Sequence, residues 1–375
     1  MEQNSSTHPL LPPTTEDQRF DWLRLLRSRR VGISTFYRLL RDHGTAAEAL
    51  VHLPEIARAA GVDGYESCPE AVVHSEMNAA KAAHARLVCR GDASYPLALT
   101  DLDDAPPMLW VIGAPDMLSK PQISLVGARN ASSLGGRMAR ALASELGQAG
   151  FVITSGMARG VDTAAHMAGL KTGTVAVLGG GVDVLYPAEN TKLAEDIVSH
   201  GGARVSEQPM GLQPQARHFP ARNRIISGLA RAVIVVEAAA KSGSLITART
   251  ALDQGRDVMA VPGHPFDARA SGCNMLLRDG ARLIRSAEDV IEALAPLAEP
   301  APELPLEPAQ SDRPLAEIAM LHQKILDRLG PSPLGEDQLI RDLGTTSRVV
   351  SPALTDLELD GRITRQSGGL IALRA

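Results

Sequence analysis

Two blocks of the sequence hold side chains that could bind an anion. The first, residues 124–166, contains SLVGARNASSLG and FVITSGMARGVDTAAH, and the second, residues 217–249, is RHFPARNRIISGLARAVIVVEAAAKSGSLITAR. In each block an apolar run leads through a loop of glycine, serine and arginine into a predicted helix. Helix N-termini attract anions, and arginine binds phosphate through paired hydrogen bonds. The two blocks therefore predict a phosphate-binding site.

The apolar runs that precede these loops predict a doubly wound parallel sheet of the α/β class. ISLVG, FVIT, TVAVLG, AVIVVE and DVMAVPG are almost continuously apolar, as expected for parallel strands that are buried on both faces. Stretches rich in alanine and leucine, such as MARALASELGQAG, separate them and indicate helices. The segment SYPLALTDLDDAPPMLWVIG is expected to add strands to the sheet. We place this α/β domain at residues 85–294.

The residues between strand and helix are expected to gather at one edge of the sheet. In open α/β sheets, ligands bind outside the carboxyl ends of the strands. Glycine lets the backbone approach a ligand closely, and Gly127, Gly156, Gly160 and Gly243 stand where this would help. The candidate residues that follow the strands are, in chain order, Arg129, Asn130, Ser132, Ser133, Ser155, Gly156, Arg159, Gly160, Asp162, Lys241, Ser242, Gly243, Ser244, Gly263 and His264.

The segment FPARNRIISGLA predicts a helix that presents arginine to this edge. Arg222 shares the helix face of the apolar residues that pack on the sheet, so it must reach the mouth of the cleft or be paired, because a lone charge is not buried. Arg224 points almost oppositely and is expected to be solvated or ion-paired. Arg217, on the preceding loop, is free to reach phosphate. Arg222 is therefore the stronger candidate and Arg224 the weaker.

Some of these side chains have a second interpretation. The serines of both blocks are good helix N-caps, and capping would account for them without any ligand. Asp162 and His166 lie about one helical turn apart. They form either a hydrogen-bonded pair in the cleft or a capping carboxylate and a separately bonded histidine.

Composition and missing motifs exclude several classes of protein. The net charge is −5, but residues 120–295 carry 19 basic against 15 acidic residues, so a phosphate partner is expected to meet this part of the chain. Three scattered cysteines form neither a disulfide framework nor a zinc motif, and no apolar run reaches the ~18 residues of a membrane span. A P-loop, a complete dinucleotide fingerprint and a nucleophile elbow are missing. We predict a cytoplasmic protein with no catalytic residue, cofactor, metal or membrane partner.

The segments on either side of the α/β domain predict two further domains. Residues 1–17 are rich in proline and threonine and are expected to be a disordered tail. Residues 18–84 predict a small helical domain, of the helix-hairpin-helix or sterile-alpha-motif kind, with a connector. Residues 295–314 are proline-rich and acidic, which is typical of a linker. Residues 315–375 show three helical patterns and then a hairpin, which is the order of a winged helix.

The charge of this winged helix argues against strong DNA binding. Its expected recognition helix, TSRVVSPALTDLELDG, holds Arg348 against Asp356, Glu358 and Asp360. Proteins that bind duplex DNA neutralise phosphates with basic side chains. We therefore predict a domain that binds protein, or that binds DNA only weakly.

Seven strings place the chain beside a known family. They are VGARNASSLGG, SGMARGVDTAAH, AVLGGGVDVLYPAEN, SEQPMG, FPARNRIISGLARAVIVVEA, SGSLITARTALDQGRDVMAVPG and GCNMLLRDGA. In this order they closely resemble the DprA/Smf family of DNA-processing proteins. The resemblance implies an extended Rossmann-like domain, a sterile-alpha-motif domain before it and a winged-helix (DML1-like) domain after it.

The same resemblance implies a function and a set of site residues. Members of the family bind single-stranded DNA without known catalysis, protect incoming strands in natural transformation, load RecA onto them and form homodimers through the Rossmann-like domain. The residues that match the family's basic pocket are Arg129, Arg217, Arg222 and Arg224, with Ser155, Gly156 and Arg159 beside it and Lys241 as a looser extrapolation. We add Asn223, Ser242 and Gly243 to the predicted DNA-binding residues.

Two other functions stay open at this point. The Rossmann-like cleft also resembles nucleotide-hydrolysing enzymes of the lysine-decarboxylase-like type, but their PGGxGTxxE motif is missing and Glu237 stands before AAAKSGSLITA instead. A pure adaptor that bridges proteins is the second alternative. Only 11 residues are aromatic, and Phe219 alone lies in the site motifs. A DNA-binding site here would depend on phosphate contacts, so binding is expected to be salt-sensitive and almost independent of base sequence.

Overall fold

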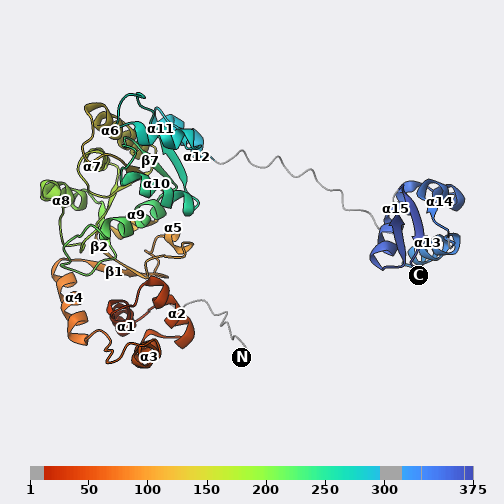
Figure 1. The fold of residues 1–375 in the computed structure, drawn as a ribbon, viewed down its shortest axis with the longest axis horizontal. Coiled ribbons are helices and arrows are strands. Elements are labelled where there is room, and N and C mark those ends of the chain that lie inside the picture. The colour runs from red at the N-terminus through yellow and green to blue at the C-terminus, as the bar shows by residue number, and fades with distance from the viewer. Residues whose placement is uncertain (1–11, 296–314, 331, 367, 375) are drawn as a thin grey trace. The chain divides into compact units, whose positions relative to one another are not determined.

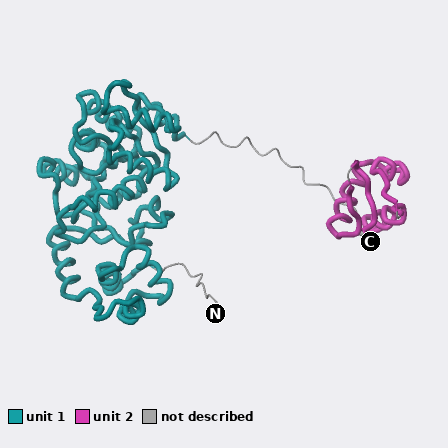
Figure 2. Tube along the Cα trace, viewed as in Figure 1, with its two compact units in different colours: residues 1–295 teal, residues 296–375 magenta. Residues whose placement is uncertain are grey.

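The computed structural model describes residues 12–295, 315–330, 332–366 and 368–374. The chain divides into two compact units, residues 1–295 and residues 296–375, which Figure 2 colours differently. Each unit has its own apolar core. Residues 296–314 of the predicted linker, and residues 1–11 of the predicted tail, lie outside the described residues.

A nine-stranded sheet forms the middle of the first unit. Its order is β1-β2-β6-β5-β4-β3-β7-β8-β9. All neighbouring pairs from β6 to β9 are parallel, whereas β2 pairs antiparallel with both β6 and β1. The strands are β1 Arg86–Cys89, β2 Met108–Gly113, β3 Gln122–Val126, β4 Val152–Ser155, β5 Thr174–Val177, β6 Ala203–Ser206, β7 Ala232–Val235, β8 Asp257–Ala260 and β9 Arg282–Leu283. This sheet confirms the predicted α/β fold.

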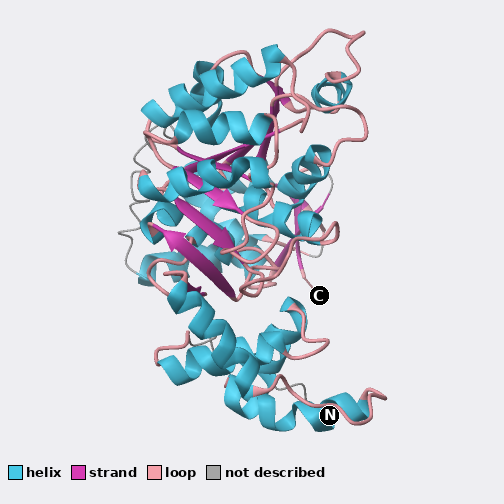
Figure 3. Ribbon diagram, turned by 90° about the vertical axis from the view of Figure 1, so that its left-hand side faces the viewer, coloured by secondary structure: helices cyan, strands magenta, loops and turns pink. Residues whose placement is uncertain are grey.

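Helices cover both faces of the sheet, as Figure 3 shows. Successive strand residues point to opposite faces, so Ala232 and Ile234 of β7 join one core while Val233 and Val235 join the other. Burial on both faces is the reason that the strand has a continuous apolar sequence. One core contains residues of α6 (Ser133–Gln148), α7 (Val161–Gly169) and α12 (Ala287–Leu294), and the other contains residues of α5 (Leu97–Thr100), α9 (His218–Leu229), α10 (Ser244–Asp253) and α11 (Ser271–Arg278).

The order in which strands are added to the sheet reverses between β3 and β7, although these two strands are parallel. From β3 the chain proceeds outward through β4, β5 and β6, with α8 (Thr191–Ser199) before β6. It then returns to β7 on the other side of β3 and continues through β8 to β9. Such a reversal is a topological switch point, where the loops after the two strands diverge and leave a crevice for a ligand.

Four helices form the N-terminal part of the first unit, drawn in red and orange in Figure 1. They are α1 (Glu16–Arg27), α2 (Ile33–His43), α3 (Ala46–Ala59) and α4 (Glu70–Ala82). Their core contains Trp22 and Phe36, whose rings meet edge to face at 5.2 Å, and it continues onto Trp110 of β2. Helix α1 begins at Glu16, inside the segment predicted as a tail, because Thr15 and Gln18 form a capping box.

The second unit has the three helices and the hairpin of a winged helix, as predicted. Its elements are α13 (Leu315–Arg328), β10 (Leu334–Gly335), α14 (Glu336–Leu343), α15 (Ser347–Leu359), β11 (Ile363–Gln366) and β12 (Leu370–Leu373). The three strands form a small sheet in the order β10-β12-β11. Within the described ranges of the chain, no helix combines the length and the apolar character that crossing a membrane requires.

Candidate functional site

A cleft of about 920 Å³ opens beside the switch point, between the loop after β3, the loop after β7 and the start of α9. Four of its wall residues are cationic, Arg129, Arg222, Lys241 and Arg269, and one, Asp162, is acidic. A small hollow adjoins the cleft at Arg129 and Arg222 and continues to Gly156 and Arg159. The excess of positive charge makes this the part of the surface that suits a phosphate.

A larger hollow elsewhere has the opposite character. It measures about 1370 Å³ and lies between α1, α4 and β1. Its wall carries six carboxylates against three arginine or lysine side chains. A phosphate would be repelled there, so size alone does not identify the anion site.

Two arginines meet at one aromatic ring in the wall of the cleft. The guanidinium carbon of Arg129 lies 5.3 Å from the centroid of the Phe219 ring, and that of Arg222 lies 5.7 Å from it. The ring face attracts both cations, while their like charges oppose each other. Tyr186 lies 6.1 Å from Phe219 between ring centroids and is half-exposed. The cleft therefore presents two cations beside a pair of aromatic rings.

Arg222 is buried in the wall and leaves only part of its guanidinium for a ligand. Its side chain is 93% buried because Nη1 donates to the carbonyl oxygens of Gly156 and Val177, the latter at 2.9 Å, and Nε donates to Asn223 Oδ1 at 3.2 Å. Within the described residues Nη2 has no hydrogen-bond partner. Burial lowers the pKa of Arg222 to about 10, and Asp162 opposes that shift. The helix-face argument thus placed Arg222 at the cleft, but it did not foresee these carbonyl partners.

Asp162 holds the loop after β4 against Arg222. Its Oδ2 accepts hydrogen bonds from the backbone N–H groups of Gly156 at 3.1 Å and Ala158 at 3.2 Å. Burial raises the pKa of Asp162, and Arg222 opposes the shift. Gly160 makes this arrangement possible, because its φ of +80° and the nearby Ala128 carbonyl leave no place for a side chain.

Asp162 and His166 do not form the hydrogen-bonded pair that one interpretation of the sequence allowed. His166 is fully buried, and its Nδ1 donates to Thr174 Oγ1 at 2.7 Å, since that oxygen itself donates to Ile153. Asp162 instead faces the loop that precedes its helix. The alternative interpretation is confirmed for the histidine only, which is bonded separately. Asp162 does not cap its helix, because the N-cap of α7 is Gly160 and no side chain caps that helix.

Arg224 lies away from the cleft, in a buried ion pair. Its side chain is 90% buried, Nη1 donates to the Asp104 carbonyl oxygen at 2.7 Å, and Nη2 is paired with Glu207. Two residues of an α-helix turn through about 200°, so Arg222 and Arg224 project to different sides of α9. Of the two environments expected for Arg224, solvent or an ion pair, the structure shows the ion pair.

The other predicted residues are divided between the protein interior and the rim. Ser155 is fully buried, and its hydroxyl donates to the Leu125 carbonyl oxygen at 2.6 Å, so it joins β4 to β3. Arg159 is exposed at the rim, 3.7 Å from Glu189. Arg217 is exposed at the N-cap of α9, outside the wall of the 920 Å³ cleft.

The loop before α10 supplies Lys241, Ser242 and Gly243 to the cleft. Lys241 is exposed, and Ser242 shares a hydrogen bond of 2.6 Å with the hydroxyl of Ser244. Gly243 has φ of −61° and open space around it. Any residue adopts that φ, so the backbone conformation does not require glycine here, and the close approach of a ligand at Gly243 stays a prediction.

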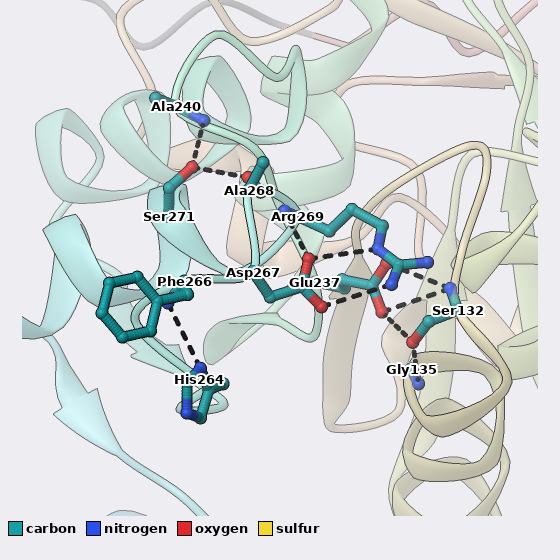
Figure 4. A network of polar contacts seen from close by, with 10 residues as sticks. All are labelled: Ser132, Gly135, Glu237, Ala240, His264, Phe266, Asp267, Ala268, Arg269 and Ser271. Carbon is teal, nitrogen blue, oxygen red and sulfur yellow. Dashed lines mark hydrogen bonds and ion pairs between the residues drawn. The ribbon is translucent and has the colours of Figure 1, made fainter.

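Two wall residues to which we assign a role, Arg269 and Tyr186, are absent from the sequence-based candidates. Arg269, in the loop between β8 and α11, is half-exposed and bonds Asp267 at 3.2 Å. Figure 4 shows its side chain extending toward Glu237. The sequence offered a signal for it, because the same loop follows the strand DVMA, whose Gly263 and His264 were noted. Tyr186 is the other, at the end of the GGGVDVLYP loop.

Comparison with known proteins identifies the family. The sequence model of DNA recombination-mediator protein A matches residues 86–295. Residues 16–79 match a DprA-like N-terminal HHH domain, and residues 307–369 match a DprA winged helix domain. The helix-hairpin-helix description is one of the two that the sequence patterns left open for the N-terminal helices.

Individual relatives agree over more than half of the chain. DNA processing protein DprA of Streptococcus pneumoniae is 45% identical over 53% of this chain and 71% of its own length, and Protein Smf of Escherichia coli is 38% identical over 75% of each. The X-ray structure of Streptococcus pneumoniae DprA superposes with a TM-score of 0.61 at 35% identity, covering 72% of this chain and 97% of that one. A structure concerned with the single-stranded DNA binding mode of Helicobacter pylori DprA superposes with a TM-score of 0.51 at 29% identity, covering 56% of this chain and 97% of that one. The chain belongs to the DprA/Smf family of DNA recombination-mediator proteins.

Proposed function

We propose that this protein binds single-stranded DNA in the 920 Å³ cleft. The observation that carries the proposal is the placement of Arg129 and Arg222 on one ring, that of Phe219, at distances of 5.3 and 5.7 Å. Two like charges held this close are stabilised by an anion between or beside them. The related Helicobacter pylori protein, whose structure concerns single-stranded DNA binding, supports DNA as the source of that anion.

The cleft suits a strand whose bases are unpaired. Phosphates would meet Arg129, Lys241 and Arg269, while the half-exposed Tyr186 ring offers a face on which a base can stack. Stacking contributes about 1–3 kcal/mol for each base, and the Phe219 ring is already contacted by two arginines, so stacking is limited to about one base. Phosphate contacts would therefore supply most of the affinity, so binding should weaken steeply with salt and depend little on sequence.

The cellular role that we propose is based on the family to which the chain belongs. We infer a recombination mediator that acts without catalysis in the cytoplasm, protects single strands taken up in natural transformation, and loads RecA onto them as a homodimer formed by the Rossmann-like domain. The support is the match of the family model to residues 86–295.

We propose a protein, and not duplex DNA, as the partner of the winged helix. Helix α15 carries Asp356 and Glu358, and the wing residue Arg365 lies 3.5 Å from Glu358. The acidic side chains would repel a phosphate backbone, and the nearby arginine is already paired.

The experiment is fluorescence anisotropy of labelled oligo-dT, single-stranded and duplexed with oligo-dA, at several salt concentrations. The test variants are Arg129→Glu and Lys241→Glu, because both side chains are exposed and their replacement leaves the core intact. Arg278→Glu is the matched control, since Arg278 is exposed on α11 and lies outside the cleft wall. Charge reversal at Arg222 is less informative, because its side chain is buried and bonds two backbone carbonyl oxygens, so the substitution would also disturb the fold.

The proposal is supported if the affinity for single-stranded oligo-dT falls at least about tenfold in both cleft variants and stays within about twofold of the wild type in Arg278→Glu. A lost phosphate contact of about 1.4 kcal/mol corresponds to a tenfold change in affinity. A wild type that binds duplex as tightly as single strands, or cleft variants that bind as well as the control, would overturn it.

A further inference from the structure

The crevice between β3 and β7 is the place where an open α/β sheet ordinarily holds a nucleotide. The strands β3 and β7 are parallel, but successive strands are added in one direction from β3 to β6 and in the other from β7 to β9. This reversal of the strand order makes the crevice the switch point of the fold. In dinucleotide-binding sheets the phosphate lies against the N-terminus of the helix that follows the first strand. Here that helix is α6, which begins at Ser133 after the loop from β3.

A side chain of the protein itself fills this place. Glu237, two residues beyond the end of β7, is 92% buried. Its Oε1 accepts a hydrogen bond from the backbone N–H of Ser132 at 3.0 Å, and its Oε2 accepts one from Ser132 Oγ at 2.5 Å. Figure 4 shows the carboxylate lying against Ser132 at the start of the helix. It receives the N–H donor that a phosphate oxygen would otherwise use.

The backbone closes the crevice at the same point. The N–H of Ala128 donates to the carbonyl oxygen of Glu237 at 2.7 Å, which ties the loop after β3 to the loop after β7. A Cβ at Gly135 would collide with the Glu237 carboxylate, so the first turn of α6 is built closely around this group. Ser132 Oγ also accepts from Gly135 N at 2.9 Å, which completes the cap. The Glu237 carboxylate is thus packed and hydrogen-bonded inside the crevice as part of the folded structure.

A hollow of about 500 Å³ lies on the other side of this carboxylate, between α6 and the loop after β8. That volume lies within the range of small-molecule sites. Much of its wall is apolar, with Leu134, Met138 and Val261, and its charged residues are Arg137, Glu237 and Asp267. A nucleoside would fit by size, whereas a phosphate placed at the start of α6 would meet the Glu237 carboxylate.

We infer that Glu237 is a specificity-determining residue, which excludes nucleotides and free phosphate from the switch-point crevice. The Glu237 carboxylate would repel a phosphate placed at the start of α6, because both groups are negative. The carboxylate cannot move away into water without losing its hydrogen bonds to Ser132. Polyanions are left with the open 920 Å³ cleft on the side of α9 and α10. This second consequence rests on the proposed binding of single-stranded DNA, whereas the exclusion of nucleotides does not.

The test is isothermal titration with ADP and with inorganic pyrophosphate, on the full chain. Glu237→Ala removes the carboxylate and its volume, and Glu237→Gln removes the charge while its amide oxygen can still accept from Ser132 N. Glu145→Ala is the matched control, because it makes the same change in net charge at an exposed position of α6. Circular dichroism establishes that each variant is folded.

We expect the wild type and Glu145→Ala to bind each probe equally weakly, through the cationic wall of the 920 Å³ cleft, and Glu237→Ala to bind both at least about tenfold more tightly than the wild type. Glu237→Gln should gain at least about threefold, since only the repulsion is removed. Affinity for oligo-dT in the Glu237 variants should stay within about threefold of the wild type.

Wild-type protein that binds ADP as tightly as Glu237→Ala would overturn the inference, and so would a folded Glu237→Gln that gains no affinity for pyrophosphate. The glutamine variant decides the matter if the alanine variant does not fold. The nucleotide titrations contain no DNA, so a failure of the single-stranded DNA proposal would appear only in the oligo-dT measurements.

Discussion

Asp162 and Arg222 are joined through the backbone of one residue, Gly156. The N–H of Gly156 donates to Asp162 at 3.1 Å, and its carbonyl oxygen accepts from Arg222 Nη1. Both side chains are more than nine-tenths buried. The negative charge of Asp162 therefore balances the positive charge that Arg222 places under the cleft, and the loop between them is fixed by both.

Asp162→Asn should destabilise the protein by about 3 kcal/mol, because removing one partner leaves the other charge buried and uncompensated. Arg222→Gln should cost a similar amount. The double variant should lose less than the sum of the two, since the charges of both partners are then gone. Urea unfolding followed by circular dichroism measures each value.

The control for this pair is Arg159→Ala, which breaks the exposed contact with Glu189 at 3.7 Å. Surface pairs contribute little, so its effect should stay below about 0.5 kcal/mol. Strict additivity of Asp162→Asn and Arg222→Gln would show that the two charges do not stabilise each other.

Arg269→Ala should weaken single-stranded DNA binding and make it less dependent on salt. Arg269 lines the cleft, and one lost phosphate contact lowers the slope of log K against log salt by about 0.7 for a single strand. Arg278→Ala is a close match, since Arg278 is also exposed and bonds a neighbouring aspartate, Asp279 at 3.0 Å. It should leave both the affinity and the slope unchanged. Equal effects of the two substitutions would place Arg269 outside the DNA path.

His166 should make the stability of the protein depend on pH below neutrality. Burial lowers the pKa of folded His166 to about 3, whereas the unfolded chain takes up a proton near pH 6.5. The unfolded state thus binds more protons between these values, so the stability present above pH 6.5 is lost as the pH falls toward 3. Between pH 6.5 and 5 the loss amounts to about 2 kcal/mol.

His166→Asn keeps a donor for Thr174 but carries no titrating ring, so its unfolding free energy should fall less than that of the wild type over the same pH range. The comparison isolates His166, because the raised pKa of Asp162, which acts in the opposite direction, is present in both proteins. Urea midpoints at pH 6.5 and pH 5 provide the measurement. Parallel losses in the two proteins would contradict the assignment.

Ending the chain after residue 295 should leave DNA binding by the first unit unchanged. That unit has its own core and contains the whole cleft, while helix α15 of the second unit presents acidic side chains. Anisotropy with single-stranded and duplex oligonucleotides should give dissociation constants within about twofold of the full chain. A loss of duplex affinity above that factor would show that the winged helix contributes to DNA binding.

The sequence predicted the sheet because its strands are buried on both faces. Continuous apolar runs such as AVIV have few other uses, and β7 divides its residues between two cores as that pattern implies. The meeting of Arg129, Gly156 and Lys241 near one edge was predictable for a related reason, since parallel strands bring their carboxyl ends together. Arg269 follows the same rule, but its loop was too long for the sequence to say which residue returns to the cleft.

The roles of the individual polar side chains were less predictable. Arg222 bonds the carbonyl oxygen of Gly156, 66 residues away in the chain, and Arg224 bonds that of Asp104, 120 residues away. Glu237 fills the switch-point crevice through contacts with Ser132, 105 residues away. No local pattern reports such partners, because they depend on how loops from different strands approach one another.

The sequence by itself therefore determined the order of the elements, the class of the fold and the edge at which the anion-binding residues lie, since periodicity and the succession of strand, loop and helix are local properties. Only the tertiary structure decided which of those residues face the cleft, which are held by carbonyl and carboxylate groups, and that Glu237 occupies the crevice. Burial of a polar group requires a partner, and the partner is supplied by whichever segment the fold brings beside it.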